Sequence, residues 1–238
     1  MTVACLLLHN FFCRATISHD LRTPLTTISG NASSLLSNGA MFDEATKRQL
    51  YLDIYDDSMW LVELVENLLS ATHIEEGRMT LRASAELLSD IVEEAMRHVD
   101  HKVASHRLFV DCGDELLLVK ADGKLIVQVI VNLVDNAVKY TPPDSFVAVS
   151  AGKRGNMAEI SVTDTGHGIS DGEKGKVFDK FYSGTHKIRD NRRSLGLGLF
   201  LCKAIVEAHG GTIWVSDNLP HGAVFSFTLP LEEVALHE

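Results

Sequence analysis

Apolar side chains recur every three or four residues along the first third of the chain. From residue 15 to 37 they form one stripe: Ile17, Leu21, Leu25, Ile28, Ala32 and Leu35. Such a heptad spacing is typical of one face of a long helix. Asn38-Gly39 ends this stripe, and Asp43-Glu44 supplies acids suited to a helix N-terminus. A second stripe then runs to about Glu76-Gly77 through Leu50, Ile54, Leu61, Leu64, Leu68 and Ala71.

Two amphipathic helices joined by a short loop predict an antiparallel hairpin over residues 1–77. A lone hairpin cannot bury both stripes, so we expect two copies to pair into a four-helix bundle. Residues 1–13 are apolar but too short to cross a bilayer. We interpret them as an extension of the first helix or the boundary of a truncated chain, with a signal-peptide core as the alternative.

After Gly77 the pattern changes to alternating helices and strands. Helices are predicted at 86–99, 122–140 and 196–209, and strands near 107–111, 116–119, 146–151, 157–163, 211–216 and 223–229. This mixture predicts an α/β domain over residues 78–238, with helices on one face of a sheet. The fold class is therefore α plus α/β.

Composition narrows the function classes. The 238 residues carry a formal charge of −10, which disfavours general nucleic-acid binding. The four cysteines form no Cys-x-x-Cys pair, which argues against a zinc site or a disulfide framework and suits a reducing cytosol. No apolar run reaches the roughly 18 residues of a membrane span.

The first candidate for covalent chemistry is the run Ser18-His19-Asp20-Leu21-Arg22-Thr23-Pro24-Leu25. A histidine whose neighbour can fix its tautomer is equipped to act as a nucleophile. Thr23 stands one helical turn after His19, so the two share a helix face. Pro24 cannot donate a hydrogen bond to the Asp20 carbonyl, so we expect a bend just beyond the site.

The apolar helix at 122–140 carries a second candidate. Asn132 and Asn136 lie one turn apart, and Lys139 and Tyr140 follow one turn later, which gives the helix one polar face. Amide oxygens suit a hard cation such as Mg²⁺ that bridges phosphate oxygens. The alternative is a polar network in the core that satisfies itself.

Two glycine-containing turns complete the candidates. Asp164-Thr165-Gly166-His167-Gly168-Ile169 follows a strand, and its carboxylate can accept a hydrogen bond from an exocyclic amine such as that of adenine. Gly196-Leu197-Gly198-Leu199 opens a helix, as anion sites do. The alternative for the turn at 164–169 is an ordinary turn with no ligand. Cations precede the glycines at 196–198 and could meet a triphosphate, or could form a solvated basic loop: Lys180, Lys187, Arg189, Arg192 and Arg193.

Taken together, these segments resemble the sensor histidine kinases. The run at 18–25 resembles their H box, Asn132–Tyr140 the N box, and Asp164-x-Gly166-x-Gly168 the G1 box. Phe178-x-x-Phe181 resembles the F box and Gly196-x-Gly198 the G2 box. The five boxes stand in the family's order over about residues 15–230. Within the family, the chain looks most like the potassium-responsive KdpD group.

The resemblance implies a dimerising phosphoacceptor hairpin and an α/β sandwich ATP-binding domain of the gyrase, Hsp90 and histidine-kinase type. It implies that ATP with Mg²⁺ phosphorylates His19, that Asp20 orients this histidine, and that Thr23 positions water for dephosphorylation of the regulator. It places Mg²⁺ on Asn132 and Asn136. The implied nucleotide-binding residues are Asn132, Asn136, Ala137, Lys139, Tyr140, Asp164, Gly166, Gly168, Ile169, Phe181, Gly196, Leu197, Gly198 and Leu199.

The implied partners are a second copy of the chain and the receiver domain of a response regulator, with no nucleic acid. No sensor region is present, so we expect a cytoplasmic kinase core whose parent protein is anchored to the bacterial inner membrane. Two alternative functions are a catalytically idle dimer scaffold and an ATPase of chaperone or topoisomerase type. The acceptor histidine on a helical hairpin and the intact polar positions favour the kinase.

Overall fold

The computed structural model describes residues 3–78, 80–99, 103, 105–113, 115–182, 184 and 196–232, with side chains from Leu21 onward except that of Glu75. The chain divides into two compact units, and the boundary along the sequence falls between Thr72 and His73. The domain limits of 1–77 and 78–238 stay a prediction. No helix in the described part of the chain has the length and hydropathy needed to cross a bilayer.

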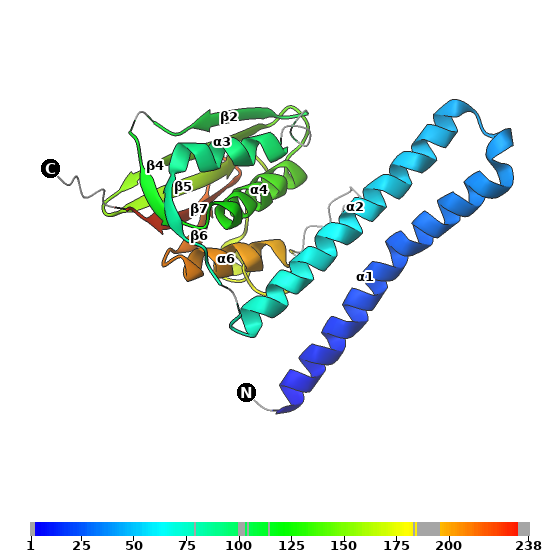
Figure 1. The fold of residues 1–238 in the computed structure, drawn as a ribbon, viewed down its shortest axis with the longest axis horizontal. Helices are drawn as coiled ribbons and strands as arrows, with labels where there is room; N and C mark the ends of the chain where they lie inside the picture. The colour runs from blue at the N-terminus through cyan, green and yellow to red at the C-terminus, as the bar shows by residue number, and fades with distance from the viewer. Residues whose placement is uncertain are drawn as a thin grey trace. The chain divides into compact units, whose positions relative to one another are not determined.

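The first unit is a helical hairpin (Figure 1). Helix α1 spans Val3–Asn38, a 3-10 turn η1 covers Gly39–Met41, and helix α2 spans Glu44–Glu75. Asp43 caps the start of α2, because its Oδ1 accepts a hydrogen bond of 2.7 Å from the Thr46 backbone N–H. Hydrogen bonding by Thr46, through its side chain and then through its backbone N–H, lowers the pKa of Asp43. Because α1 starts at Val3, it includes most of the apolar residues 1–13. The helix continues through Pro24 without interruption.

One face of the hairpin remains apolar and open in the single chain. Pro24 and Leu64 are buried, but ten large apolar side chains are exposed: Leu25, Leu36, Met41, Tyr51, Leu52, Tyr55, Met59, Val62, Val65 and Leu69. A soluble surface seldom leaves this much apolar area uncovered. The hairpin therefore needs a partner.

The second unit is an α/β fold. A five-stranded sheet has the order β2-β4-β5-β7-β6, with β2 parallel to β4 and the other pairs antiparallel. Its strands are β2 (Arg107–Asp111), β4 (Phe146–Arg154), β5 (Met157–Asp164), β6 (Ile213–Asp217) and β7 (Ala223–Pro230). A separate antiparallel pair joins β1 (Ser84–Leu87) to β3 (Leu118–Ala121).

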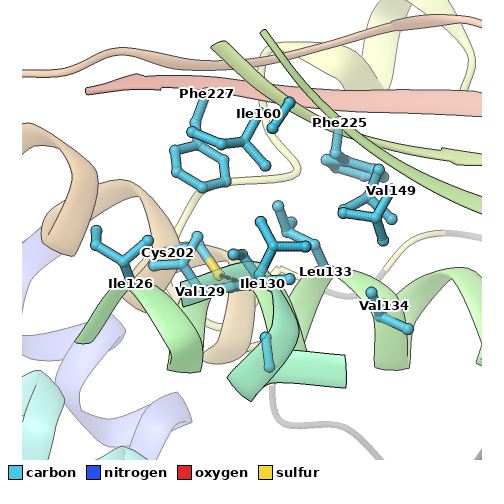
Figure 2. Close-up of a cluster of buried hydrophobic side chains, with 14 of the residues drawn as sticks. Ile126, Val129, Ile130, Leu133, Val134, Val149, Ile160, Cys202, Phe225 and Phe227 are labelled. Carbon is cyan, nitrogen blue, oxygen red and sulfur yellow. Dashed lines mark hydrogen bonds between the residues drawn. The ribbon is translucent and has the colours of Figure 1, made fainter. Parts of the chain in front are cut away.

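Helix α4 (Gly123–Tyr140) organises the core of this unit, packing against both α3 (Leu88–Val99) and α6 (Gly198–Ala208). Its apolar face, at spacings of three and four, is buried: Ile126, Val129, Ile130, Leu133, Val134, Ala137 and Val138. Figure 2 shows this face meeting Val149, Ile160, Phe225 and Phe227 from the sheet. Each large side chain buried here contributes roughly 1.5–3 kcal/mol, so α4 is fixed firmly on the sheet.

The predicted class, a helical hairpin followed by an α/β domain, is confirmed, with two local differences. Residues 86 and 87, predicted as the start of helix 86–99, instead belong to strand β1 (Ser84–Leu87), because residues 84–87 pair with 118–121. The short helix α5 (Asp171–Lys174) was not predicted, since four residues carry no detectable periodicity. Other ends shift by one to three residues, as expected for helix and strand boundaries.

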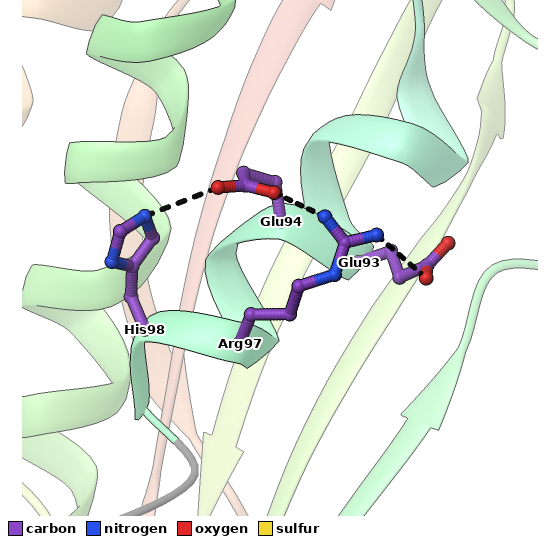
Figure 3. Close-up of polar contacts among 4 residues, drawn as sticks. All are labelled: Glu93, Glu94, Arg97 and His98. Carbon is purple, nitrogen blue, oxygen red and sulfur yellow. Dashed lines mark hydrogen bonds and ion pairs between the residues drawn. The ribbon is translucent and has the colours of Figure 1, made fainter.

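The outer face of α3 carries a small charge network (Figure 3). Arg97 pairs with Glu93 at 2.8 Å and with Glu94, and His98 Nε2 lies 3.3 Å from Glu94. These carboxylates raise the pKa of Arg97. All four side chains are exposed, so the network contributes little to stability and marks a solvated surface.

Candidate active site

A pocket of about 720 Å³, its open mouth included, lies in the α/β unit. Its lining comes from α4, the turn after β5, the α5 region, α6 and β7: Asn136, Tyr140, Asp164, His167, Gly168, Ile169, Glu173, Val177, Tyr182, Gly184, Leu199, Ala223 and Phe225. Apolar walls with a few polar groups are typical of a small-molecule site. Residues from three of the segments predicted from the sequence therefore line one pocket: the helix at 122–140, the turn at 164–169 and the glycine-containing segment at 196–199.

Helix α4 reaches the pocket because it has two faces. Its apolar positions are committed to the core, which leaves Asn136 and Tyr140, one turn apart, on the pocket wall. Lys139 lies beside Tyr140, with its Nζ 5.7 Å from the ring centroid, but does not line the pocket. Ala137, predicted as a binding residue, is 3% exposed and belongs to the core face.

Asp164 is the buried anion of the pocket, with 5% of its surface exposed. It is the last residue of β5, and its Oδ1 accepts hydrogen bonds from the backbone N–H groups of Gly166 (2.8 Å) and Ala223 (3.2 Å). Burial raises the pKa of Asp164, and these two bonds and the nearby His167 oppose that rise. Both bonds end on Oδ1, so Oδ2 is the oxygen left to meet a ligand.

The turn after Asp164 fits tightly against α4. A Cβ at Gly166 would lie 2.6 Å from the Tyr140 carbonyl oxygen and 3.0 Å from Asp164 Oδ1, so only glycine fits. His167 packs edge-on against Tyr140, with ring centroids 5.9 Å apart. Gly168 and Ile169 then follow on the pocket wall. The turn thus connects the polar end of α4 to the carboxylate of β5.

Asn132 sits beneath the start of α6, with its Cγ 4.0 Å from where a Cβ of Gly198 would stand. Its Nδ2 is buried and has no hydrogen-bond partner of standard geometry among the described residues. Burial raises the pKa of the neighbouring Cys202 thiol to about 12, an effect that the Asn132 amide opposes. Asn132 therefore borders the site without lining the pocket.

The remaining predicted binding residues lie at or near the N-terminal end of α6: Phe181, Gly196, Leu197, Gly198 and Leu199. The Phe181 N–H donates to the Gly196 carbonyl at 3.0 Å, Leu197 is buried, and Gly198 begins α6. Of this group only Leu199 lines the pocket. The basic residues predicted at 187, 189, 192 and 193 lie outside the described residues.

The acceptor segment belongs to α1. His19 and Asp20 are in the helix, but their side chains lie outside those described. Thr23 is half-buried, and its carbonyl accepts a hydrogen bond of 3.2 Å from Thr27 Oγ1. The helical register therefore keeps His19 and Thr23 one turn apart, as predicted.

Sequence reasoning missed several pocket residues, among them Glu173, Tyr182, Ala223 and Phe225. Glu173 Oε1 accepts a hydrogen bond of 3.1 Å from the Tyr182 hydroxyl, and its Oε2 accepts one of 2.6 Å from Ser170 Oγ. Tyr182 directly follows the Phe178-x-x-Phe181 pattern, so that pattern pointed to the segment in which Tyr182 lies. Ala223 and Phe225 gave no such signal, because only the pairing of β7 with β5 brings them to the site.

The resemblance described above predicts that Asp164 contacts the adenine of a nucleotide, so replacing Asp164 by asparagine is expected to weaken ADP binding at least about ten-fold, the size of a lost hydrogen bond to a charged group. The same change should raise the melting temperature of the nucleotide-free protein at neutral pH, because burial disfavours the carboxylate. Since the folded-state pKa of Asp164 is raised, this stability gain should shrink as the pH falls through that pKa and the wild-type carboxyl takes up its proton. Calorimetric titration and thermal melts at several pH values test both effects. Unchanged ADP affinity would contradict the predicted contact between Asp164 and adenine.

Comparison with known proteins agrees with this geometry. Residues 14–77 match the His Kinase A (phospho-acceptor) domain, and residues 121–233 match the histidine kinase-, DNA gyrase B- and HSP90-like ATPase. These two domains, in this order, define the core of a histidine kinase. The chain belongs to the sensor histidine kinases.

One curated relative is the sensor protein KdpD of Clostridium acetobutylicum, 41% identical over 216 residues, which cover 91% of this chain and 24% of that protein. The chain thus spans about a quarter of that relative's length. The solved histidine kinase AdeS of Acinetobacter baumannii shares the fold, with a TM-score of 0.69, 24% identity, and coverage of 90% of this chain and 98% of that one. The histidine kinase ThkA, solved in complex with the response regulator protein TrrA, gives a TM-score of 0.67 and 25% identity over 92% of this chain and 61% of that chain.

Proposed function

We propose that the chain transfers the γ-phosphoryl group of ATP to His19 and then to an aspartate of a response regulator. The observation that carries this proposal is the buried Asp164 carboxylate on the wall of a pocket shared with Asn136 and Tyr140. A buried acceptor with apolar surroundings suits an adenine ring, because the exocyclic amine donates a hydrogen bond and the ring covers apolar walls. The match to the ATPase family supports the choice of ATP.

The polar end of the pocket fits Mg²⁺ carried by the nucleotide. Within the described ranges, no cluster of three or more His, Cys, Asp or Glu could hold a metal ion by itself. Two neutral amides on successive turns of α4 suit an ion bound mainly by phosphate oxygens and water. We therefore assign the ion to Asn132 and Asn136, with Lys139 and Tyr140 near the phosphates. When bound, Mg²⁺ neutralises charge on the phosphate oxygens.

The nucleophile is the Nε2 of neutral His19. Its lone pair forms a bond to the γ-phosphorus, while the bond from phosphorus to the β,γ-bridging oxygen breaks and its electron pair leaves with ADP. Asp20 accepts the Nδ1–H hydrogen bond, which fixes the tautomer and stabilises the positive charge that develops on the ring. The aspartate carboxylate of a receiver domain then takes the phosphoryl group from phosphohistidine.

Two observations support the partners. The open apolar face of the hairpin suits a second copy of the same hairpin, which would complete a four-helix bundle. The ThkA structure contains a response regulator bound to the kinase, and it resembles this chain over both units. We therefore propose a homodimer that binds a receiver domain. We also propose that the parent protein is longer and anchored to a membrane.

The direct test is incubation of the full chain with γ-labelled ATP and Mg²⁺. The label should appear on the protein as an acid-labile, base-stable phosphoramidate, and should move to a purified receiver domain when one is added. Acid-stable label would point to a hydroxyl acceptor, and absence of label despite ADP binding would favour an idle scaffold.

Thr23→Ala should separate two activities. We expect self-phosphorylation within about two-fold of the wild-type rate, since the hydroxyl lies one turn from the nucleophile and takes no part in its attack. Dephosphorylation of the regulator should slow at least about ten-fold, because a positioned water loses its hydrogen-bond partner. Parallel time courses of both reactions measure the split. Equal loss of both would contradict separate roles.

A further inference from the structure

The turn between β6 and β7 folds onto the end of β5. It is closed by a hydrogen bond of 3.1 Å from the Asn218 backbone N–H to the Gly222 carbonyl. The Asn218 side chain then leaves the turn and donates its Nδ2–H to the Asp164 carbonyl oxygen at 2.8 Å. Asn218 does not line the pocket, but its side chain contacts Asp164, which does.

This contact falls where β5 stops pairing with β7, while Asp164 still pairs with Val147 of β4. The β5–β7 ladder ends with Thr163 opposite Val224, one residue before Asp164. The next backbone N–H on β7, that of Ala223, turns instead to the Asp164 side chain. The Asp164 carbonyl therefore receives a side-chain donor in place of a strand partner. Hence the turn holds Asp164 at two points, its backbone through Asn218 and its carboxylate through Ala223.

The close fit of the turn strengthens this hold. Gly222 has a φ of 122°, and a Cβ there would overlap the Asp164 carbonyl oxygen. His221 Nδ1 lies 3.1 Å from the Thr165 carbonyl oxygen, which ties the next residue of the chain to the same turn. The carboxylate is therefore held from two sides, by the Gly166 N–H of its own turn at 2.8 Å and by the Ala223 N–H of the turn between β6 and β7 at 3.2 Å.

We propose that Asn218 is a positioning residue for selection of the purine base, fixing Asp164 so that Oδ2 accepts a hydrogen bond from an amino group at the purine 6-position. A base with a carbonyl at this position, such as guanine, presents an acceptor to an acceptor and is rejected. The proposal rests on the proposed function, in which Asp164 meets adenine. Loss of the Asn218 donor lets the carboxylate move, so affinity for ADP and discrimination against GDP fall together.

The experiment compares Asn218→Ala, Asn218→Asp and wild type in the full chain by calorimetric titration with ADP and with GDP. Both variants should bind ADP about five-fold more weakly, the size of one hydrogen bond, and should show a smaller ratio of ADP to GDP affinity. Asn218→Asp retains the size of the side chain and a residue type suited to turns, so it guards against misfolding of the alanine variant.

Ser226→Ala is the matched control. It removes the 2.8 Å hydrogen bond between Ser161 and Ser226 on the same strand pair, away from Asp164. This variant should keep the wild-type ratio. An unchanged ratio in both Asn218 variants would overturn the proposal. Asp164→Asn in the same assay shows which proposal has failed. If the Asn218 variants keep the ratio but Asp164→Asn loses ADP affinity, only the role of Asn218 is wrong. If Asp164→Asn binds ADP normally, the proposed contact between Asp164 and adenine is itself wrong.

Discussion

Replacing His19 by glutamine is expected to abolish labelling by γ-labelled ATP while ADP binds as it does to wild type. Glutamine has a comparable size and polarity, but its amide lone pair is delocalised and cannot attack phosphorus. The nucleotide pocket belongs to the other unit of the fold, so the change leaves its residues intact. Labelling is measured after denaturing electrophoresis at neutral pH, and ADP binding by calorimetry.

His73→Gln is the matched control, since His73 is an exposed histidine in the last turn of α2. That variant should label at the wild-type rate. Stable label on the His19 variant would show that another residue accepts the phosphoryl group. Loss of label in both variants would indicate damage to the hairpin rather than loss of the acceptor.

Asn136→Asp is expected to reduce labelling at least about 100-fold and to leave the dimer intact. An amide can offer its oxygen to a cation and its N–H to a phosphate oxygen at once. A carboxylate cannot donate, and it adds negative charge beside a polyphosphate and near Asp164 in a partly desolvated pocket. Initial labelling rates measure the first effect, and light scattering measures the oligomeric state.

Asn156→Asp makes the same chemical change on the exposed turn between β4 and β5. It should label normally, which separates a local effect of Asn136 from a general effect of added charge. Labelling of the Asn136 variant at the wild-type rate would contradict its role at the phosphates. A monomeric Asn136 variant would instead mean that the two units depend on each other for assembly.

Much of the fold could be predicted because its longest elements have regular patterns. The hairpin stripes repeat over many turns, and the core face of α4 keeps its spacings of three and four from Ile126 to Val138. Strand β1 was missed because its existence depends on residues 118–121, more than thirty positions away. Such pairing leaves no trace in local periodicity.

The candidate site was predicted unevenly for a similar reason. Asn136, Tyr140 and Asp164 were found because polar residues on an apolar helix, or at the end of an apolar strand, stand out. Phe225 and Ala223 look like ordinary strand residues, and become part of the pocket only because β7 lies beside β5. Asn218 is harder still, since its role passes through a backbone carbonyl on another strand.

Helix α4 carries the core on one face and the pocket on the other, and this arrangement restricts how the protein can change over evolutionary time. A core substitution that rotates α4 by a small angle also moves Asn136 and Tyr140 relative to Asp164. The two faces therefore cannot drift independently, and an altered residue on one face favours a compensating change on the other. A change in nucleotide preference would therefore require the interior and the pocket wall to change together.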